Sequence, residues 1–194
     1  MANYKAISAT LETVARVLET SYEPSLLDDT PLQFLVYGSK DFEEPMTAGV
    51  SLFPYRIHAN GAFRSPPSKR VTDEGVRHPP QLGLDVHFLL TAWGSRASLE
   101  LAILGWAMRV LEDRGTLTAS LLNGVSPGTF HGDETVEVVP ADLPMEDMMR
   151  IWDGLPRDYQ TSVPYTARVV RIESFVAPQP LTRVLEREFS VRVP

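Results

Sequence analysis

Two stretches of the chain place apolar residues every three or four positions, which is the spacing that lines one face of an α-helix. The apolar positions of the first stretch are Ile7, Leu11, Val14 and Leu18. Those of the second stretch are Leu99, Ile103, Trp106 and Val110. Gly115 follows the second stretch, where a glycine commonly caps a helix in the left-handed conformation. The pattern therefore predicts two principal helices, Tyr4–Thr20 and Ser98–Arg114.

Other segments alternate apolar and polar residues, as expected of a β-strand with one buried face. The clearest alternation has its apolar residues at Leu82, Leu84, Val86, Phe88 and Leu90. Asp85, His87 and Leu89 should face the opposite side of that strand. Further strands are predicted at residues 33–37, 50–58, 135–139, 165–172 and 188–193. Because Pro54 has no amide hydrogen to donate, its strand is expected at a sheet edge or with a bulge.

These elements predict an α+β fold, in which two principal helices pack on one mainly antiparallel sheet. Residues 1–176 are expected to form this single domain, and residues 177–194 a C-terminal extension. The extension begins with Ala-Pro-Gln-Pro, a stiff spacer, and ends in a strand with apolar residues Phe189, Val191 and Val193. That terminal strand can pair with its own sheet or with a neighbouring subunit, and the sequence leaves both open.

Composition narrows the classes of function. The 194 residues include no cysteine, which removes disulfides, thiolate nucleophiles and cysteine metal ligands. A net charge of −7 argues against general binding to nucleic acid, which requires a positive surface. The chain has no run of roughly 18 apolar residues that could span a membrane, and its N-terminus lacks the pattern of a signal peptide. We therefore expect folding and assembly in the cytoplasm.

One long irregular segment, residues 64–81, is rich in proline and in basic residues. Its candidate contact residues are Arg64, Lys69, Arg70 and Arg77. Loops of this length inside a compact domain are usually functional or disordered. The segment is therefore either a disordered surface loop or an arm that becomes ordered on a partner.

Candidate catalytic and metal sites are weak. Residues 124–128 match the G-x-S-x-G motif around Ser126, but a nucleophile elbow needs a strand before the serine and a helix after it. The predicted elements offer a helix or turn before Ser126 and a strand after it, so a simple turn is favoured. The four histidines, His58, His78, His87 and His131, lack the spacing of metal ligands. We expect no catalytic residue, no bound cofactor and no metal.

Two further groups have alternative interpretations. Asp85 and His87 share one face of a predicted strand, so they could form an acid–base couple, although ordinary polar contacts are favoured. Asp142 is expected to cap a short acidic helix. The apolar residues of that helix are Met145, Met148, Met149 and Trp152. They favour packing in the core, with a methionine-rich contact surface as the alternative.

Four segments, taken in order, resemble the cap or tail-terminator proteins of extracellular contractile injection systems. Anti-feeding prophage and virulence-cassette particles carry such proteins. The most distinctive segment is Leu-Gly-Leu-Asp-Val-His-Phe-Leu-Leu-Thr-Ala-Trp at residues 82–93, followed by a helix that carries Leu-Gly-Trp-Ala-Met at 104–108. The other segments are residues 4–8, residues 52–60, and Ile-Trp at 151–152 followed by residues 165–170. Together they span residues 4–173, nearly the whole chain.

This resemblance implies a fold similar to phage tail terminators and a structural function. Members of that family form a six-fold ring at the end of the particle far from the baseplate. The ring contacts the last inner-tube ring and the last sheath layer and stops the growth of both, without catalytic residues or cofactors. The implied partners are five further copies of the chain, the inner-tube protein and the sheath protein, whether or not the particle is later released.

Two other functions remain open at this point. The first is a small hydrolase that uses Ser126. The second is a monomeric assembly chaperone or binding module that acts only while the particle is built. The resemblance favours the cap over both.

Overall fold

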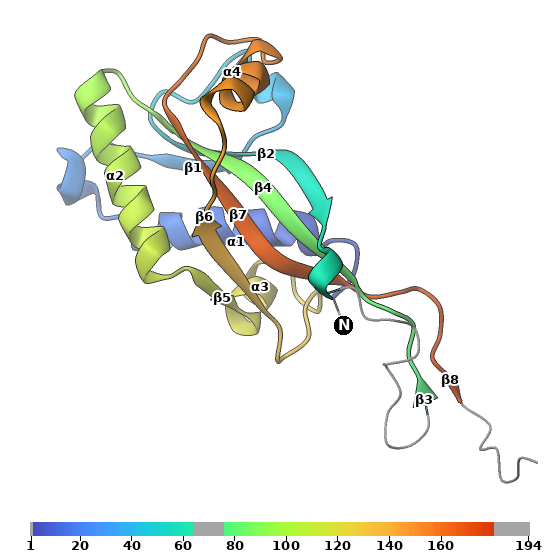
Figure 1. The fold of residues 1–194 in the computed structure, drawn as a ribbon. Coiled ribbons are helices and arrows are strands. Elements are labelled where there is room, and N and C mark those ends of the chain that lie inside the picture. The colour runs from blue at the N-terminus through green and yellow to red at the C-terminus, as the bar shows by residue number, and fades with distance from the viewer. Residues whose placement is uncertain (1, 64–75, 181–194) are drawn as a thin grey trace, which may run out of the picture.

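The computed structural model describes residues 2–63 and 76–180 (Figure 1). Its centre is a six-stranded sheet with the strand order β1-β2-β4-β7-β6-β5. These strands are β1 Gln33–Val36, β2 Gly49–Ala59, β4 Leu82–Trp93, β5 Thr116–Thr118, β6 Thr135–Pro140 and β7 Ser162–Ile172. Neighbouring strands run antiparallel, except that β1 and β2 are parallel. The predicted α+β fold with a mainly antiparallel sheet is confirmed.

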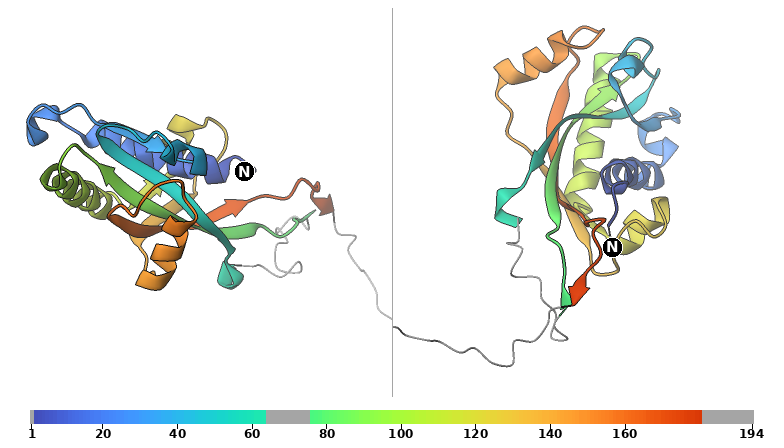
Figure 2. Two further views of the ribbon diagram at one scale, coloured as in Figure 1. Left: turned by 90° about the horizontal axis from the view of Figure 1, so that it is seen from above. Right: turned by 90° about the vertical axis from the view of Figure 1, so that its right-hand side faces the viewer.

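Both principal helices form close to their predicted bounds, as α1 Ala6–Ser21 and α2 Ala97–Asp113. They lie on one face of the sheet together with α3 Ala119–Val125, whereas α4 Met145–Asp153 lies on the other face (Figures 1 and 2). The described residues also include three short 3₁₀ turns: η1 Pro24–Leu27, η2 Ser39–Phe42 and η3 Gly61–Phe63. The sheet is therefore covered on one face by three helices and on the other only in part.

The main core lies between the sheet and α1, α2 and α3. The predicted inward residues of β4 fill its centre: Leu84, Val86, Phe88 and Leu90 are all buried in this cluster. Leu82 is the exception, with 51% of its side chain exposed. It is the first residue of β4, at the end of the strand that leads away from the helices (Figure 1).

A second core covers the opposite face of the sheet beneath α4. It contains Leu89 and Trp93 of β4, together with Phe42, Met148 and Trp152. The rings of Phe42 and Trp152 meet edge to face with centroids 5.5 Å apart, and Trp93 Nε1 donates a hydrogen bond of 2.8 Å to Ser51 Oγ. The expectation of a single buried face for β4 is therefore wrong from Leu89 onward, because a helix distant in the sequence covers the second face.

The position of β2 decides between the edge strand and the bulge that Pro54 predicted. β2 lies between β1 and β4 and is not an edge strand. The register of the β2–β4 pair does shift between Pro54 and Arg56, so the predicted bulge is present. β1 pairs with β2 only as far as Leu52, and Pro54 therefore faces no strand on that side. A proline is tolerated here because no ladder partner requires its amide hydrogen.

Two local predictions also change. α4 begins after Pro144 without a side-chain cap, so Asp142 does not cap it. Leu117–Leu122, the helix or turn predicted before Ser126, contains residues of the edge strand β5 as well as of α3. Three residues are too few to show a period of two, because an alternating pattern needs several repeats to be recognised.

A two-stranded ribbon extends from the body of the molecule beyond β4 and β7 (Figures 1 and 2). It consists of β3 Val76–Arg77 and β8 Gln179–Pro180, which pair antiparallel. We call residues 76–81 and 173–180 the arm. The start of the C-terminal extension is thus a strand of this arm.

Candidate functional site

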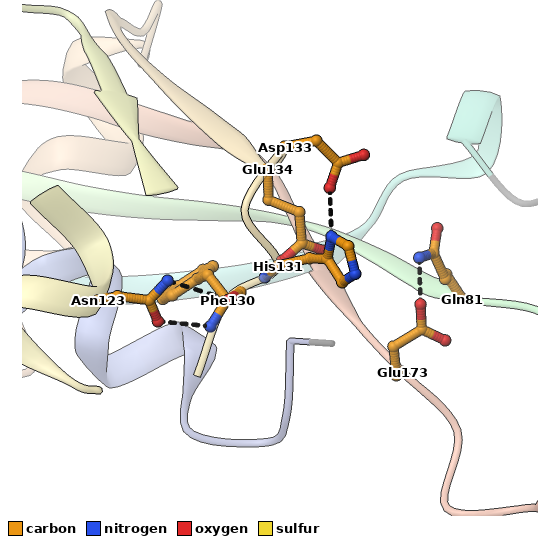
Figure 3. Close-up of polar contacts among 7 residues, drawn as sticks. All are labelled: Gln81, Asn123, Phe130, His131, Asp133, Glu134 and Glu173. Atoms are coloured by element: carbon orange, nitrogen blue, oxygen red, sulfur yellow. Dashed lines mark hydrogen bonds and ion pairs between the residues drawn. The ribbon is translucent and has the colours of Figure 1, made fainter. Parts of the chain in front are cut away.

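The base of the arm is fastened to the body by polar contacts from two directions. Gln81 Nε2 donates a hydrogen bond to Glu173 Oε1 (Figure 3). This bond joins the two segments of the chain that form the arm. The Glu173 amide donates a 2.8 Å bond to the carbonyl of Ala2, which is fully buried. The Asn3 amide in turn bonds the Thr129 carbonyl at 3.2 Å. The N-terminal residues therefore lie between the arm and the loop after α3.

Exposed apolar side chains gather at this base. Phe175 is 84% exposed, Tyr4 63% and Val176 61%, and the rings of Tyr4 and Phe175 lie 6.2 Å apart between centroids. A large apolar side chain gains about 1.5–3 kcal/mol when it is fully buried. An aromatic pair left open to solvent at the base of a projecting ribbon has the properties of a protein contact surface.

Only one of the seven predicted contact residues lies in the described part of the chain. Arg77 is in β3, opposite Gln179 of β8, and is exposed. The arm therefore carries it away from the body. The other predicted contact residues lie outside the described residues: Arg64, Lys69, Arg70, Phe189, Val191 and Val193.

Asp85 and His87 lie on the same face of β4, but each is hydrogen-bonded elsewhere. Asp85 Oδ2 accepts a 2.9 Å bond from Asn60 Nδ2, and His87 Nδ1 lies 2.9 Å from Thr166 Oγ1. Burial lowers the pKa of His87, and the positive charge of Arg56 lowers it further. An imidazole bonded to a threonine hydroxyl fits a polar contact within the sheet better than an acid–base couple.

The segment around Ser126 is a turn between a helix and a strand. Ser126 follows α3 directly, and its Oγ lies 2.7 Å from Thr129 Oγ1. Asn123 bonds both the amide and the carbonyl of Phe130 at 3.0 Å (Figure 3). The strand, serine and helix order of a nucleophile elbow is not present here. This agrees with the predicted turn.

His131 belongs to the same loop, where nearby carboxylates bind it (Figure 3). Its Nδ1 lies 2.7 Å from Asp133 Oδ1, and its amide donates a 2.7 Å bond to Glu134 Oε2. The hydrogen bond from His131 lowers the pKa of the Asp133 carboxyl. Among the described residues, no three histidines or carboxylates converge as metal ligands would.

α4 divides its apolar residues between the core and the surface. Met148 and Trp152 are buried in the second core, whereas Met145 is 66% and Met149 39% exposed. Beside Met149 and Trp152, a hollow of about 650 Å³ extends to Tyr159. Core packing is therefore confirmed for Met148 and Trp152. A contact surface formed by Met145 and Met149 stays a prediction.

The family model of the Pvc16 N-terminal domain matches residues 9–186. The chain belongs to this family. That assignment confirms the resemblance that the four sequence segments indicated. No curated protein sequence matches the chain significantly.

Two solved structures share the fold of this Pvc16 N-terminal domain. One is the sheath/tube terminator of an extracellular contractile injection system, PVC, in its extended state, with a TM-score of 0.56 and 17% identity over 94% of this chain. The other is the tube-terminating cap of the anti-feeding prophage, with a TM-score of 0.54 and 16% identity over 89% of this chain. The match covers 64% of the first protein and 60% of the second, so the chain spans less than two thirds of either.

Across residues 2–63 and 76–180, no helix combines the length and the apolar character needed to cross a bilayer.

Proposed function

We propose that this chain caps the baseplate-distal end of a phage-tail-like contractile particle, where it stops the growth of the inner tube and the sheath. The observation that carries the proposal is the match to the Pvc16 N-terminal domain over residues 9–186. It is supported by the fold shared with a sheath/tube terminator and with a tube-terminating cap. The partners are the inner-tube protein and the sheath protein.

The cap acts as a homo-hexameric ring. The end of a rotationally symmetric tube presents the same surface once per subunit, and a ring of equal symmetry can satisfy every copy with one kind of contact. The arm supplies the chemistry for such a contact, because Tyr4, Phe175 and Val176 expose apolar surface at its base. Arg77, one of the predicted contact residues, lies in β3 and adds a positive charge to the arm.

The function is structural and not enzymatic, with assembly in the cytoplasm. A terminator must complete the open surfaces of the last ring on one side and present no matching surface on the other. None of this requires bond chemistry. The hydroxyl of Ser126, hydrogen-bonded to Thr129 in a turn, gives the hydrolase alternative no support.

Deletion of the gene from a producing strain tests the cap function. We expect few intact particles, with sheaths of irregular length or detached from their tubes, as measured in electron micrographs. The wild-type gene supplied in trans should restore uniform length. Particles of normal yield and length in the deletion strain would refute the proposal. Absence of the chain from purified particles, measured by mass spectrometry, would favour the assembly chaperone instead.

A further inference from the structure

The sheet ends at β1 with backbone groups that face outward. The Gln33 amide donates to the Ala48 carbonyl at 3.1 Å, and the Tyr37 amide donates to the Leu52 carbonyl at 2.9 Å. Successive peptide groups of a strand point to opposite sides. The amides and carbonyls of Phe34 and Val36 therefore point away from β2, toward the open edge of the sheet.

A groove runs beside this open edge. It has a volume of about 360 Å³ and is bordered by α1, β1 and the end of α3. Its lining includes Ala15, Val125 and Leu35, with the flanking charges Glu12, Arg16 and Glu19. Leu35 is 47% exposed on the outer side of β1. Edge strands are usually protected by shortness, lysine, proline or a bulge; β1, Gln-Phe-Leu-Val, is short but carries no lysine, proline or bulge.

The chain itself contains a segment suited to this edge. Residues 188–193, Glu-Phe-Ser-Val-Arg-Val, alternate apolar and polar side chains as a strand with one buried face does. Phe189, Val191 and Val193 would face the groove, and Ser190 and Arg192 the outer side. Counting side chains, the segment 181–194 carries three arginines against two glutamates, and the groove carries two glutamates against Arg16, which pairs with Glu19 at 2.6 Å. The two net charges are therefore small and of opposite sign.

The segment cannot reach β1 of its own subunit. Val36 pairs with Leu52 of β2, which pairs with Leu90 of β4, so β1 lies beside the Leu90 end of β4. The segment follows Pro180, on the arm that projects beyond Leu82 at the other end of β4 (Figure 1). Leu82 to Leu90 spans ~27 Å along the strand, and two strand spacings add ~10 Å sideways. Residues 181–187 extend at most ~24 Å. They are too short even before the length of the arm is added.

We propose that the open edge of β1 accepts residues 188–193 of a neighbouring copy as an additional strand. Main-chain hydrogen bonds to Phe34 and Val36 would hold the strand, and its apolar side chains would fill the groove beside α1. This inference rests on the ring stated under the proposed function and identifies a contact between its subunits.

Engineered cysteines test this contact, because the chain has none of its own. One full-length variant carries Leu35→Cys, and a second carries Ser190→Cys or Arg192→Cys, to cover two registers. The two are mixed at high protein concentration and oxidised. We expect disulfide-linked heterodimers. Thr116→Cys is the matched control, since Thr116 is exposed on β5 at the other edge of the sheet, and it should give few heterodimers.

Hydrogen exchange of the unmodified full-length protein gives a second measurement. With nine-tenths of β1 edges occupied at high concentration, the Phe34 and Val36 amides should exchange about tenfold more slowly than in dilute monomer. The Leu35 amide, which already faces β2, should change little.

Three results would overturn the inference: no heterodimers at any concentration, equal yields with Thr116→Cys, or a disulfide that forms within one chain of a Leu35→Cys/Ser190→Cys double variant. Each is measured on isolated protein. Their failure is therefore distinguishable from failure of the cap function, which is measured on particles.

Discussion

Replacement of Phe42 by alanine should destabilise the protein strongly, although this residue lies in a 3₁₀ turn outside the main core. Its side chain is fully buried, and its ring packs against Phe53 at 5.2 Å, Tyr37 at 5.4 Å and Trp152 at 5.5 Å between centroids. Truncation of a buried phenylalanine to alanine lowers the free energy of unfolding by about 3–5 kcal/mol. The loss of the aromatic contacts places the expected decrease toward the upper end of this range. For a chain of this size the thermal midpoint should fall by roughly 6–20 °C.

Thermal and urea unfolding followed by circular dichroism measure this effect, and near-ultraviolet spectra report on the packing of Trp93 and Trp152. Phe42→Leu is the first control and should cost less than Phe42→Ala, because it loses the aromatic contacts but keeps most of the buried volume. Phe175→Ala is the second control, since 84% of that side chain is exposed and the unfolding free energy should change by less than ~0.5 kcal/mol. A Phe42→Ala midpoint no lower than that of Phe175→Ala would refute the second core.

Three further predictions concern assembly and pH. Phe175→Asp should leave the thermal midpoint nearly unchanged but reduce the fraction of capped particles in electron micrographs, and normal capping would exclude the base of the arm as a contact surface. Replacement of Arg64, Lys69, Arg70 and Arg77 by glutamate should likewise preserve the thermal midpoint but weaken co-sedimentation with particles. Unaltered co-sedimentation would indicate that these residues belong to a surface insertion without a role in docking. Because the pKa of His87 is lowered in the native state, the unfolded state binds more protons, and stability should decrease as pH falls below ~6.5 until the native pKa is passed. His87→Gln should flatten that decrease in urea unfolding at several pH values, and an unchanged pH profile would contradict it.

The sequence by itself determined the principal helices and the central strand. α1, α2 and β4 are long enough to repeat their apolar spacing several times, so the period is visible without a partner. The ordered resemblance of four segments also indicated the family that the match over residues 9–186 confirmed. The proline in β2 predicted a bulge correctly, because the missing amide hydrogen is a property of the residue alone.

Only the tertiary structure decided which residues and elements contact one another. Leu89 is buried because α4, more than fifty residues later in the chain, returns to the second face of the sheet. Asp85 and His87 alternate correctly on β4, yet their partners Asn60 and Thr166 come from other parts of the chain. The same holds for the open edge of β1 and for the pairing of β3 with β8. Local periodicity reports which side of an element is apolar, whereas burial, hydrogen-bond partners and free edges depend on contacts between residues distant in sequence.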